Sequence, residues 1–258
     1  MLYFFRGGFV SNNVVRYNNG FDTVPLRNFT SIEMNIFWSI CSKMKRKGTQ
    51  EVTFSFETFK ELAHYDRREK DKFYTSMKNI SEKLGTLTYK FEDENIFEQL
   101  WLFQRFVVRK EEETVTIQAS DRFEFILNSI GSNFTRFELE NMTQLSSGYV
   151  KELYRQLMSH RDINKRSGAW FVKIEDFRFA LDIPPSYRMS DINRQIFKQA
   201  EKEFLAKDKY GHQVFQKFRV EKVKAHKGNK IGSLRIYFKE VDNLPHITFH
   251  DWTQEENN

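Results

Sequence analysis

The side chains with the greatest capacity for specific contacts lie in the segment RMSDINRQIFKQAEK, residues 188–202. Asn and Arg are the residue types that make bidentate hydrogen bonds to adenine and guanine edges in the major groove of DNA. Three cations recur at every fourth position, so a helix would hold them on one face, opposite Ile192 and Ile196. The pattern predicts base or phosphate contacts, with an ordinary solvated face as the alternative. The predicted contact residues here are Arg188, Ser190, Asn193, Arg194, Lys198 and Lys202.

The chain after this segment is also basic. Two strands are predicted over 214–224 and 231–238, joined by a turn at His226–Asn229. A basic turn can reach backbone phosphates and so supply affinity that is independent of sequence, although charge also protects an edge hairpin from aggregation. The predicted contacts of this hairpin are Lys222, Lys224, Lys227 and Lys230. An earlier run adds Arg161, Lys165 and Arg166 as predicted phosphate contacts.

The first half of the chain is a weaker candidate for DNA binding. Its long predicted helix, 67–84, begins with mixed charges, and the acidic runs 92–94 and 111–113 would repel phosphates. We expect an auxiliary DNA contact there, combined with a protein–protein surface that could use exposed aromatic residues such as Trp101 and Phe103. The predicted auxiliary contacts are Arg67, Arg68, Lys70 and Lys72.

Readings that require catalysis find little support. Three residues separate His246 from His250, whereas one residue separates the paired histidines of nicking enzymes, and no Tyr follows them. No Gly-rich phosphate loop of the Walker type is present. Cys41 is the one cysteine and lies on an apolar helical face, which favours a core residue in a reducing compartment over a catalytic thiol. We therefore expect no enzyme activity, no metal and no cofactor.

The distribution of charge divides the chain. Residues 151–239 hold 21 Lys and Arg against 10 Asp and Glu, whereas residues 1–132 hold 19 against 18. Residues 240–258 carry five acids and no Lys or Arg. A basic block of this length favours a polyanionic partner for the C-terminal half. No stretch approaches 18 uninterrupted apolar residues, so we expect no membrane segment and a cytoplasmic location.

One order of predicted elements occurs twice in the chain. A capped helix from Thr30 precedes a short strand at 52–54, a short helix, and the long helix 67–84, and strand-like segments follow at 87–91, 96–108 and 114–117. The second half repeats this order with a helix after Ser147, a strand at 170–172, a short helix, a helix over 189–206 and the basic hairpin. An offset of 118 residues superposes the two copies, pairing Phe56 with Ile174. This order is that of a winged helix-turn-helix, in which the second helix of the motif enters the major groove.

The sequence thus predicts an α+β fold of two tandem winged helix-turn-helix domains. We expect an N-terminal extension (1–20), a first domain (21–133) for dimerisation and auxiliary DNA contact, a second domain (134–240) that is the main DNA-reading unit, and an acidic tail (241–258). Short helices are expected over 121–128 and 134–145, packed on both units.

Four blocks of the chain resemble one known family. They are VVRYNN (14–19), TVPLRNFTSIEMNIFWSIC (23–41), KGTQEVTFSFETFKEL (47–62) and FALDIPPSYRMSDINRQIFK (179–198). They are similar to the replication initiator (Rep) proteins of iteron-containing, theta-replicating plasmids, particularly those of Gram-positive bacteria. The likeness covers about residues 13–240, and the first nine residues precede its start.

This resemblance implies several properties. Monomers of such initiators bind direct repeats in double-stranded DNA at the origin, help to open it, and recruit the host replication initiator and the replicative helicase. Homodimers formed through the N-terminal domain can repress the initiator's own gene. The main base contacts of the family map here onto Arg188–Lys202. A tandem winged-helix transcriptional regulator without a replication role is the alternative, and only the four blocks separate the two.

Overall fold

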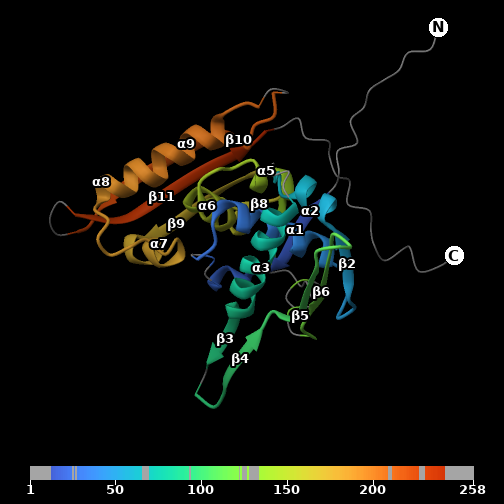
Figure 1. Cartoon of the computed structure of the whole chain (residues 1–258). Coiled ribbons are helices and arrows are strands. Elements are labelled where there is room, and N and C mark those ends of the chain that lie inside the picture. Colours follow the sequence, from blue (N-terminus) through green and yellow to red (C-terminus); the bar gives the residue numbers. More distant parts are fainter. Residues whose placement is uncertain are drawn as a thin grey trace, which may run out of the picture.

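The structure, a computed structural model, describes residues 13–241 apart from a few short stretches. The residues inside that range that it leaves undescribed are 25, 27, 66–69, 93, 122, 124–126, 128–133, 209–210 and 227–229. The fold mixes helices with antiparallel sheets (Figure 1). Within the described part, no helix has both the length and the hydropathy needed to cross a membrane.

The first half builds a three-stranded antiparallel sheet, in the order β2-β6-β5, with three helices around it. Its elements are α1 (Ser31–Met44), β2 (Val52–Ser55), α2 (Phe56–Leu62), α3 (Lys70–Thr86), β5 (Phe103–Arg109) and β6 (Thr114–Ala119). The predicted capping box at the start of α1 is confirmed: the Glu33 backbone N–H donates to Thr30 Oγ1 at 3.3 Å, and the Thr30 N–H donates to Glu33 Oε2 at 2.7 Å. This order of elements confirms the first winged-helix domain.

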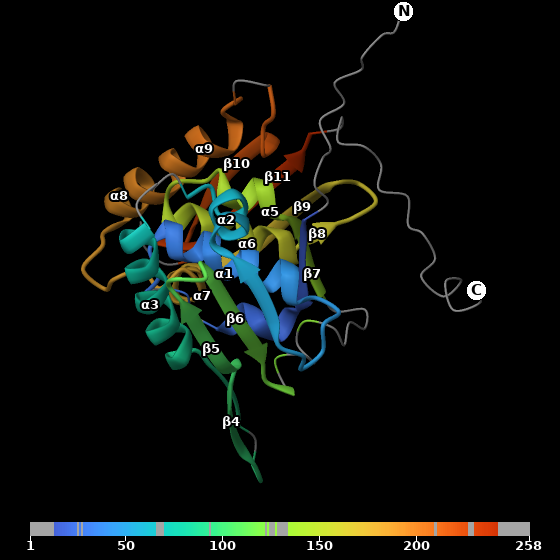
Figure 2. The ribbon, with the colours of Figure 1, turned by 45° about the vertical axis from the view of Figure 1, so that its right-hand side comes forward.

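A separate two-stranded hairpin stands between α3 and β5. Strands β3 (Thr88–Glu92) and β4 (Phe97–Trp101) pair only with each other and project from the body of the molecule (Figures 1 and 2). The sequence predicted one strand-like segment over 96–108, which is wrong. Buried Leu102 divides it, because its carbonyl accepts the Ser120 N–H at 3.0 Å and so starts β5 in the other sheet.

The second half builds a four-stranded sheet, in the order β10-β11-β9-β8. Its elements are α6 (Gly148–Ser159), β8 (Arg161–Asp162), β9 (Ser167–Lys173), α7 (Ile174–Ala180), α8 (Met189–Ile192), η2 (Asn193–Phe197), α9 (Lys198–Leu205), β10 (Phe215–Lys224) and β11 (Ile231–Glu240). Helix α7 begins 118 residues after α2, at Ile174 and Phe56, as the predicted repeat requires. The second winged-helix domain is confirmed.

Two expectations about the ends of the domains need correction. Residues 134–138, expected in a short helix, form strand β7 (Phe134–Glu138), and the helix that follows is α5 (Leu139–Thr143). Strand β7 pairs along its whole length with β1 (Val14–Asn18), which falls inside the expected N-terminal extension. The strand forms because Thr135 and Phe137 both point into the core, a period of two. The expected helix over 121–128 lies largely outside the described residues.

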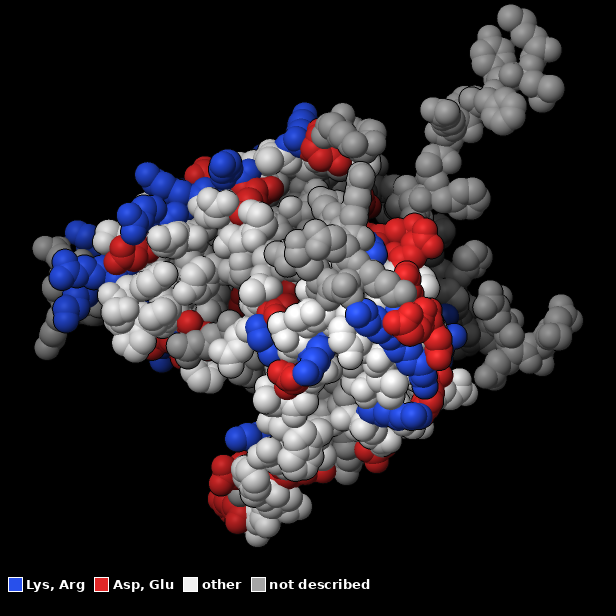
Figure 3. Space-filling view, in the orientation of Figure 1, with Lys and Arg blue, Asp and Glu red and all other residues white. Residues whose placement is uncertain are grey.

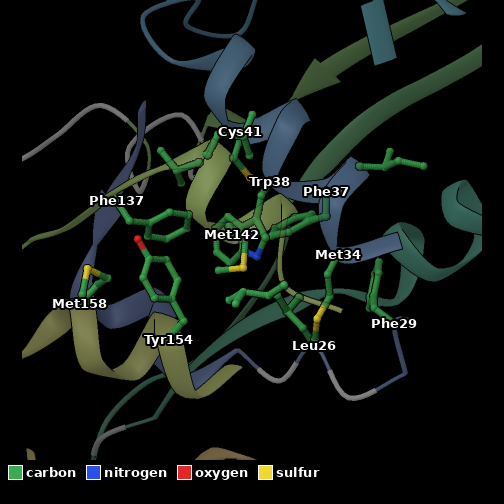
Figure 4. Packing of buried hydrophobic residues seen from close by; sticks show 14 of the residues in the cluster. Leu26, Phe29, Met34, Phe37, Trp38, Cys41, Phe137, Met142, Tyr154 and Met158 are labelled. Carbon is green, nitrogen blue, oxygen red and sulfur yellow. The ribbon is translucent and has the colours of Figure 1, made fainter. Parts of the chain in front are cut away.

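Aromatic side chains form a continuous core through both domains. Trp38 of α1 lies 5.3 Å from Phe137 of β7 between ring centroids, and Phe137 lies 5.6 Å from Tyr154 of α6. Tyr154 in turn contacts Phe204 of α9 at 6.2 Å. Figure 4 shows Trp38, Phe137 and Tyr154 together in this core. Edge-to-face aromatic packing of this kind adds to ordinary apolar burial, so one core supports both winged helices.

Helix α6 is tied to elements of the first half of the chain through buried polar groups. Lys151, with 1% of its surface exposed, donates to Asn35 Oδ1 of α1 at 2.6 Å and to the Met142 carbonyl at 2.5 Å. One turn later, Arg155 Nη1 and Nη2 donate to the carbonyls of Phe21 and Asp22 at 3.0 and 3.1 Å, in η1 (Asn19–Thr23). Because hydrogen bonds are directional, these contacts set the angle at which α6 meets the first domain.

Candidate nucleic-acid interface

The predicted contact helix forms as expected. Segments α8, η2 and α9 run on without a break as one helix, Met189–Leu205, which we call the reading helix. Its apolar side, with Ile192, Ile196, Phe197, Ala200 and Phe204, is buried in the second domain. The opposite side is exposed and carries Arg188, Ser190, Arg194, Lys198 and Lys202. Figure 3 shows Lys and Arg gathered over α8, α9 and the adjoining end of the hairpin.

A π-turn in the middle of the reading helix keeps side chains at four-residue spacing aligned on the same face. The Lys198 N–H donates to the Asn193 carbonyl, five residues back, whereas an α-helix bonds across four. In an α-helix of 3.6 residues per turn, each side chain lies slightly further around the helix axis than the one four residues before it. A π-turn has more residues per turn, so it offsets part of this rotation. Ile192, Ile196 and Ala200 can therefore all reach the core while the cations stay in line outside. Sequence reasoning missed this turn; its signal was the strict four-residue spacing.

The two most specific side chains of the reading helix each contact a charged neighbour. Arg194 Nη2 lies 3.3 Å from Asp191 Oδ1, one turn earlier, and its side chain is still 71% exposed. Asn193 is half-buried, and its Oδ1 accepts a hydrogen bond from Lys222 Nζ of β10 at 2.7 Å. Lys222 thus connects the hairpin to the reading helix, so that two of the predicted contact residues are brought together.

The hairpin β10–β11 places other cations near the reading helix. Lys222 projects from the sheet face that packs on α9, because its pairing partner Leu234 is buried. Lys224 and Lys230 are exposed at the end of the two strands, where the Ala225 N–H donates to the Lys230 carbonyl at 2.8 Å. Lys227, at the tip, lies outside the described residues. The exposed end of this hairpin extends the cationic surface of the reading helix.

The predicted phosphate contacts in 161–166 lie elsewhere. Arg161 Nη2 is 2.7 Å from Glu240 Oε2, and Arg166 Nε is 3.8 Å from the same oxygen. Burial raises the pKa of Glu240, and the two arginines oppose that rise. Only Lys165 is fully exposed, beside Asp162 at 3.2 Å. The register of β9 with β11 puts this turn about 26 Å from the basic end of the hairpin, so the structure does not bring these residues together with the reading helix.

In the first domain, α3 occupies the place of a reading helix. Arg67 and Arg68 lie outside the described residues; Lys70 and Lys72 are in the first turn of α3, and their side chains are not described. Lys78, farther along α3, is exposed, and the predicted contacts did not include it. Figure 2 shows α3 and α8 on the same side of the molecule, where one duplex could pass both.

The two aromatic residues expected at a protein–protein surface differ in their surroundings. Trp101 is 57% exposed on β4. Phe103 is half-buried and packs edge-to-face on Phe123 at 5.0 Å. Of these two residues, only Trp101 is exposed enough to contact another protein.

The chemistry of the described residues gives little for catalysis. Burial raises the pKa of the Cys41 thiol well above its ordinary value, so the thiolate is disfavoured. In the described part of the chain, no three His, Cys, Asp or Glu side chains are grouped as metal ligands would be. His246 and His250 lie outside the described residues, as do the first twelve residues and the acidic tail from 242 onward.

Two winged helices in tandem, the second with an exposed cationic helix and a basic hairpin, define a class of DNA-binding protein. The comparisons with known proteins identify the family. Residues 14–158 match the family described as initiator replication protein, WH1, and residues 173–238 match initiator Rep protein, WH2. The chain therefore belongs to the family of initiator replication proteins.

Two of the proteins similar to this chain show how far the likeness extends. A probable replication protein Rep of Bifidobacterium longum (strain NCC 2705) is 32% identical over 197 residues, which are 75% of this chain and 65% of that relative. The Pi initiator protein, solved in complex with iteron DNA, superposes with a TM-score of 0.70 at 14% identity and covers 90% of this chain and 99% of that one. The second likeness shows the fold.

Proposed function

We propose that this chain is a plasmid replication initiator that binds duplex iteron repeats at an origin. The observation that carries the proposal is the exposed face of the reading helix. Arg194, Lys198 and Lys202 line it, while the other face is fixed in the core by Ile196 and Phe204. A rigid cationic helix of this kind fits the major groove, which admits one α-helix. The likeness to the Pi initiator protein, solved with iteron DNA, supports the same partner.

Each type of side chain has its own part in the proposed contact. Arg194 reads a guanine, because its guanidinium is exposed and Asp191 holds it from one side only. Asn193 reads an adjacent base once Lys222 turns from its Oδ1 to a phosphate. Lys198, Lys202, Lys224 and Lys230 neutralise phosphates. Lys227, Lys70, Lys72, Arg67 and Arg68 remain proposed phosphate contacts from the sequence.

The finer steps of initiation are also proposals. Monomers bind the direct repeats, promote opening of the adjacent DNA, and recruit the host initiator and the replicative helicase. A homodimer through the first domain represses the chain's own gene. The limits that we expect for the two domains, 21–133 and 134–240, belong to this proposal.

The runner-up is a tandem winged-helix transcriptional regulator with no replication role. It predicts the same helix in the same groove, and therefore the same response to substitution of Arg194. The two functions differ in the DNA that the protein binds. An initiator binds direct repeats at an origin, and replication from that origin requires the protein. Replication of a plasmid that carries the upstream region, with the protein supplied from a second plasmid, distinguishes them.

The test of DNA binding uses the full chain and the duplex upstream of its gene. Arg194→Ala is expected to weaken binding by about 1–3 kcal/mol and to relax the preference at one base pair. Lys198→Gln is expected to weaken binding on every sequence and to reduce the slope of log K against log salt by about 0.9. The control is Lys207→Gln, which alters an exposed lysine beyond the reading helix. If wild-type binding shows no dependence on salt, the proposal is refuted.

A further inference from the structure

One surface of the second domain remains open when the reading helix lies in a groove. The four-stranded sheet packs its inner face on the helices through Val172, Leu234 and Ile236. Residues between these point to the other side, which we call the outer sheet face. Strand register aligns its members in rows across β10, β11 and β9. They are Lys217, Arg219, Glu221, Ser233, Arg235, Tyr237, Lys239, Phe171 and Lys173.

The outer sheet face is basic and has an aromatic centre. Its side chains include five cations and one acid, Glu221, which Arg219 binds at 2.6 Å. Phe171 is 65% exposed and meets Tyr237 edge-to-face at 5.9 Å. These two rings and Arg235 line a shallow hollow of about 430 Å³. A large exposed aromatic ring beside Tyr and Arg is the composition of a binding hot spot.

The β3–β4 hairpin of the first domain has the opposite character. Residues 88–101 contain one lysine and four acids. Phe97 and Trp101 are 62% and 57% exposed, and the pairing register puts both on one side of the hairpin, together with Glu92 and Lys90, whereas Glu98 lies on the other side. Figure 3 shows acidic side chains gathered at this end of the molecule. Both aromatic groups of the hairpin and Phe171 are exposed, so the hairpin and the outer sheet face do not cover one another within one chain.

We propose that the β3–β4 hairpin of one copy docks on the outer sheet face of the next copy. Phe97 and Trp101 contact Phe171 and Tyr237, and Glu92 lies against Arg235. The hairpin as a whole is acidic and the outer sheet face is basic, and each offers exposed aromatic surface. A contact between two different surfaces is heterologous, so copies add head to tail and do not close as a symmetric dimer.

The contact suits copies that are already neighbours. A narrow hairpin buries little area, so the contact is weak between free molecules. Copies held on adjacent repeats have a high effective concentration, at which a weak contact suffices. Repeats about two helical turns apart would present consecutive copies on the same side of the duplex. This role at tandem sites rests on the proposed function, whereas the contact itself does not require DNA.

The experiment uses two single variants of the full chain. Trp101→Ser removes the docking residue and leaves the outer sheet face, whereas Phe171→Ser does the reverse. Sedimentation velocity without DNA follows association as the protein concentration increases. Each variant alone is expected to associate about 30-fold more weakly than wild type, which corresponds to about 2 kcal/mol. An equimolar mixture is expected to give a one-to-one complex that grows no further, because one intact pair of surfaces remains.

Other outcomes overturn the proposal. Phe171→Ser protein that still self-associates like wild type, with loss only in Trp101→Ser, would show a symmetric dimer through the hairpin. If Phe171→Ser instead lost affinity for a single-stranded oligo(dT) and self-associated like wild type, the outer sheet face would be a binding surface for single-stranded nucleic acid. Wild type that stays monomeric up to about 1 mM would exclude the contact, since 1 mM is the effective concentration that short tethers give. The control is Phe179→Ser, which removes an aromatic residue that is 81% exposed outside both surfaces. If the protein failed to bind DNA but the two variants still formed a one-to-one complex when mixed, only the proposed function would be refuted.

Discussion

Lys151 makes the joint between α6 and α1 sensitive to pH. Burial lowers the pKa of its ammonium from 10.5 to about 7, and the attraction of Glu203 only partly opposes this. In the unfolded chain the lysine regains its ordinary pKa, so between pH 7 and 10.5 the unfolded state holds a proton that the folded state lacks. The free energy of unfolding then rises with pH by about 1.4 kcal/mol per unit across this window, about 5 kcal/mol in all. Below pH 7 both states are protonated and the dependence ends.

Lys151→Met tests this reasoning through the slope with pH. The variant removes two donated hydrogen bonds, to Asn35 Oδ1 and the Met142 carbonyl, which lowers stability by a constant amount. The difference between wild type and variant is expected to increase in favour of wild type by about 2–3 kcal/mol between pH 7 and 9. Urea unfolding at several pH values, followed by tryptophan fluorescence, measures it. The control, Lys207→Met at an exposed position, should parallel wild type. Parallel curves for Lys151→Met would refute the buried neutral lysine.

Two further predictions concern the core and the turn at 161–166. Trp38→Ala removes the ring between Tyr17 and Phe137 and is expected to cost about 3–5 kcal/mol; because one core joins the domains, calorimetry should show both melting in a single transition shifted to lower temperature. Glu240→Gln frees Arg161 and Arg166 and is expected to cost about 3 kcal/mol in urea unfolding, with the affinity for the upstream duplex unchanged. Tighter binding in that variant would show that the arginines reach phosphates.

Local patterns in the sequence were sufficient for most of the fold. The capping box at Thr30, the cap at Ser55 and the apolar spacing of 192–204 are contained within one or two helical turns, and the structure confirms each. The repeat at 118 residues worked because strand and short helix follow one another in both copies. The π-turn was missed because apolar residues spaced by four also fit an α-helix. The turn is needed only because all of these residues, from Ile192 to Phe204, are buried.

What the sequence could not give depends on partners that are distant in the chain. Strand β7 forms because β1, more than a hundred residues earlier in the chain, lies beside it. Its sequence, FTRFE, does not alternate apolar with polar residue types, although Thr135 and Phe137 both face the core. Arg161 and Arg166 looked like phosphate contacts because their partner, Glu240, is separated by more than seventy residues. The joint at Asn35 and Lys151 likewise combines side chains 116 positions apart. In each case the partner of the strand or side chain lies far away in the sequence, so its role is decided by a tertiary contact.

The placement of these buried polar groups bears on how two winged helices could read one site. Apolar packing between Trp38, Phe137 and Tyr154 stabilises the joint but is non-directional. Lys151 and Arg155 cost free energy to bury, yet their hydrogen bonds are satisfied only at one angle between α6 and the first domain. That angle fixes α3 relative to the reading helix and with it the spacing of two contacts along a duplex. Without these hydrogen bonds the joint would loosen, the two helices would bind independently, and the reach of a fixed pair would be lost.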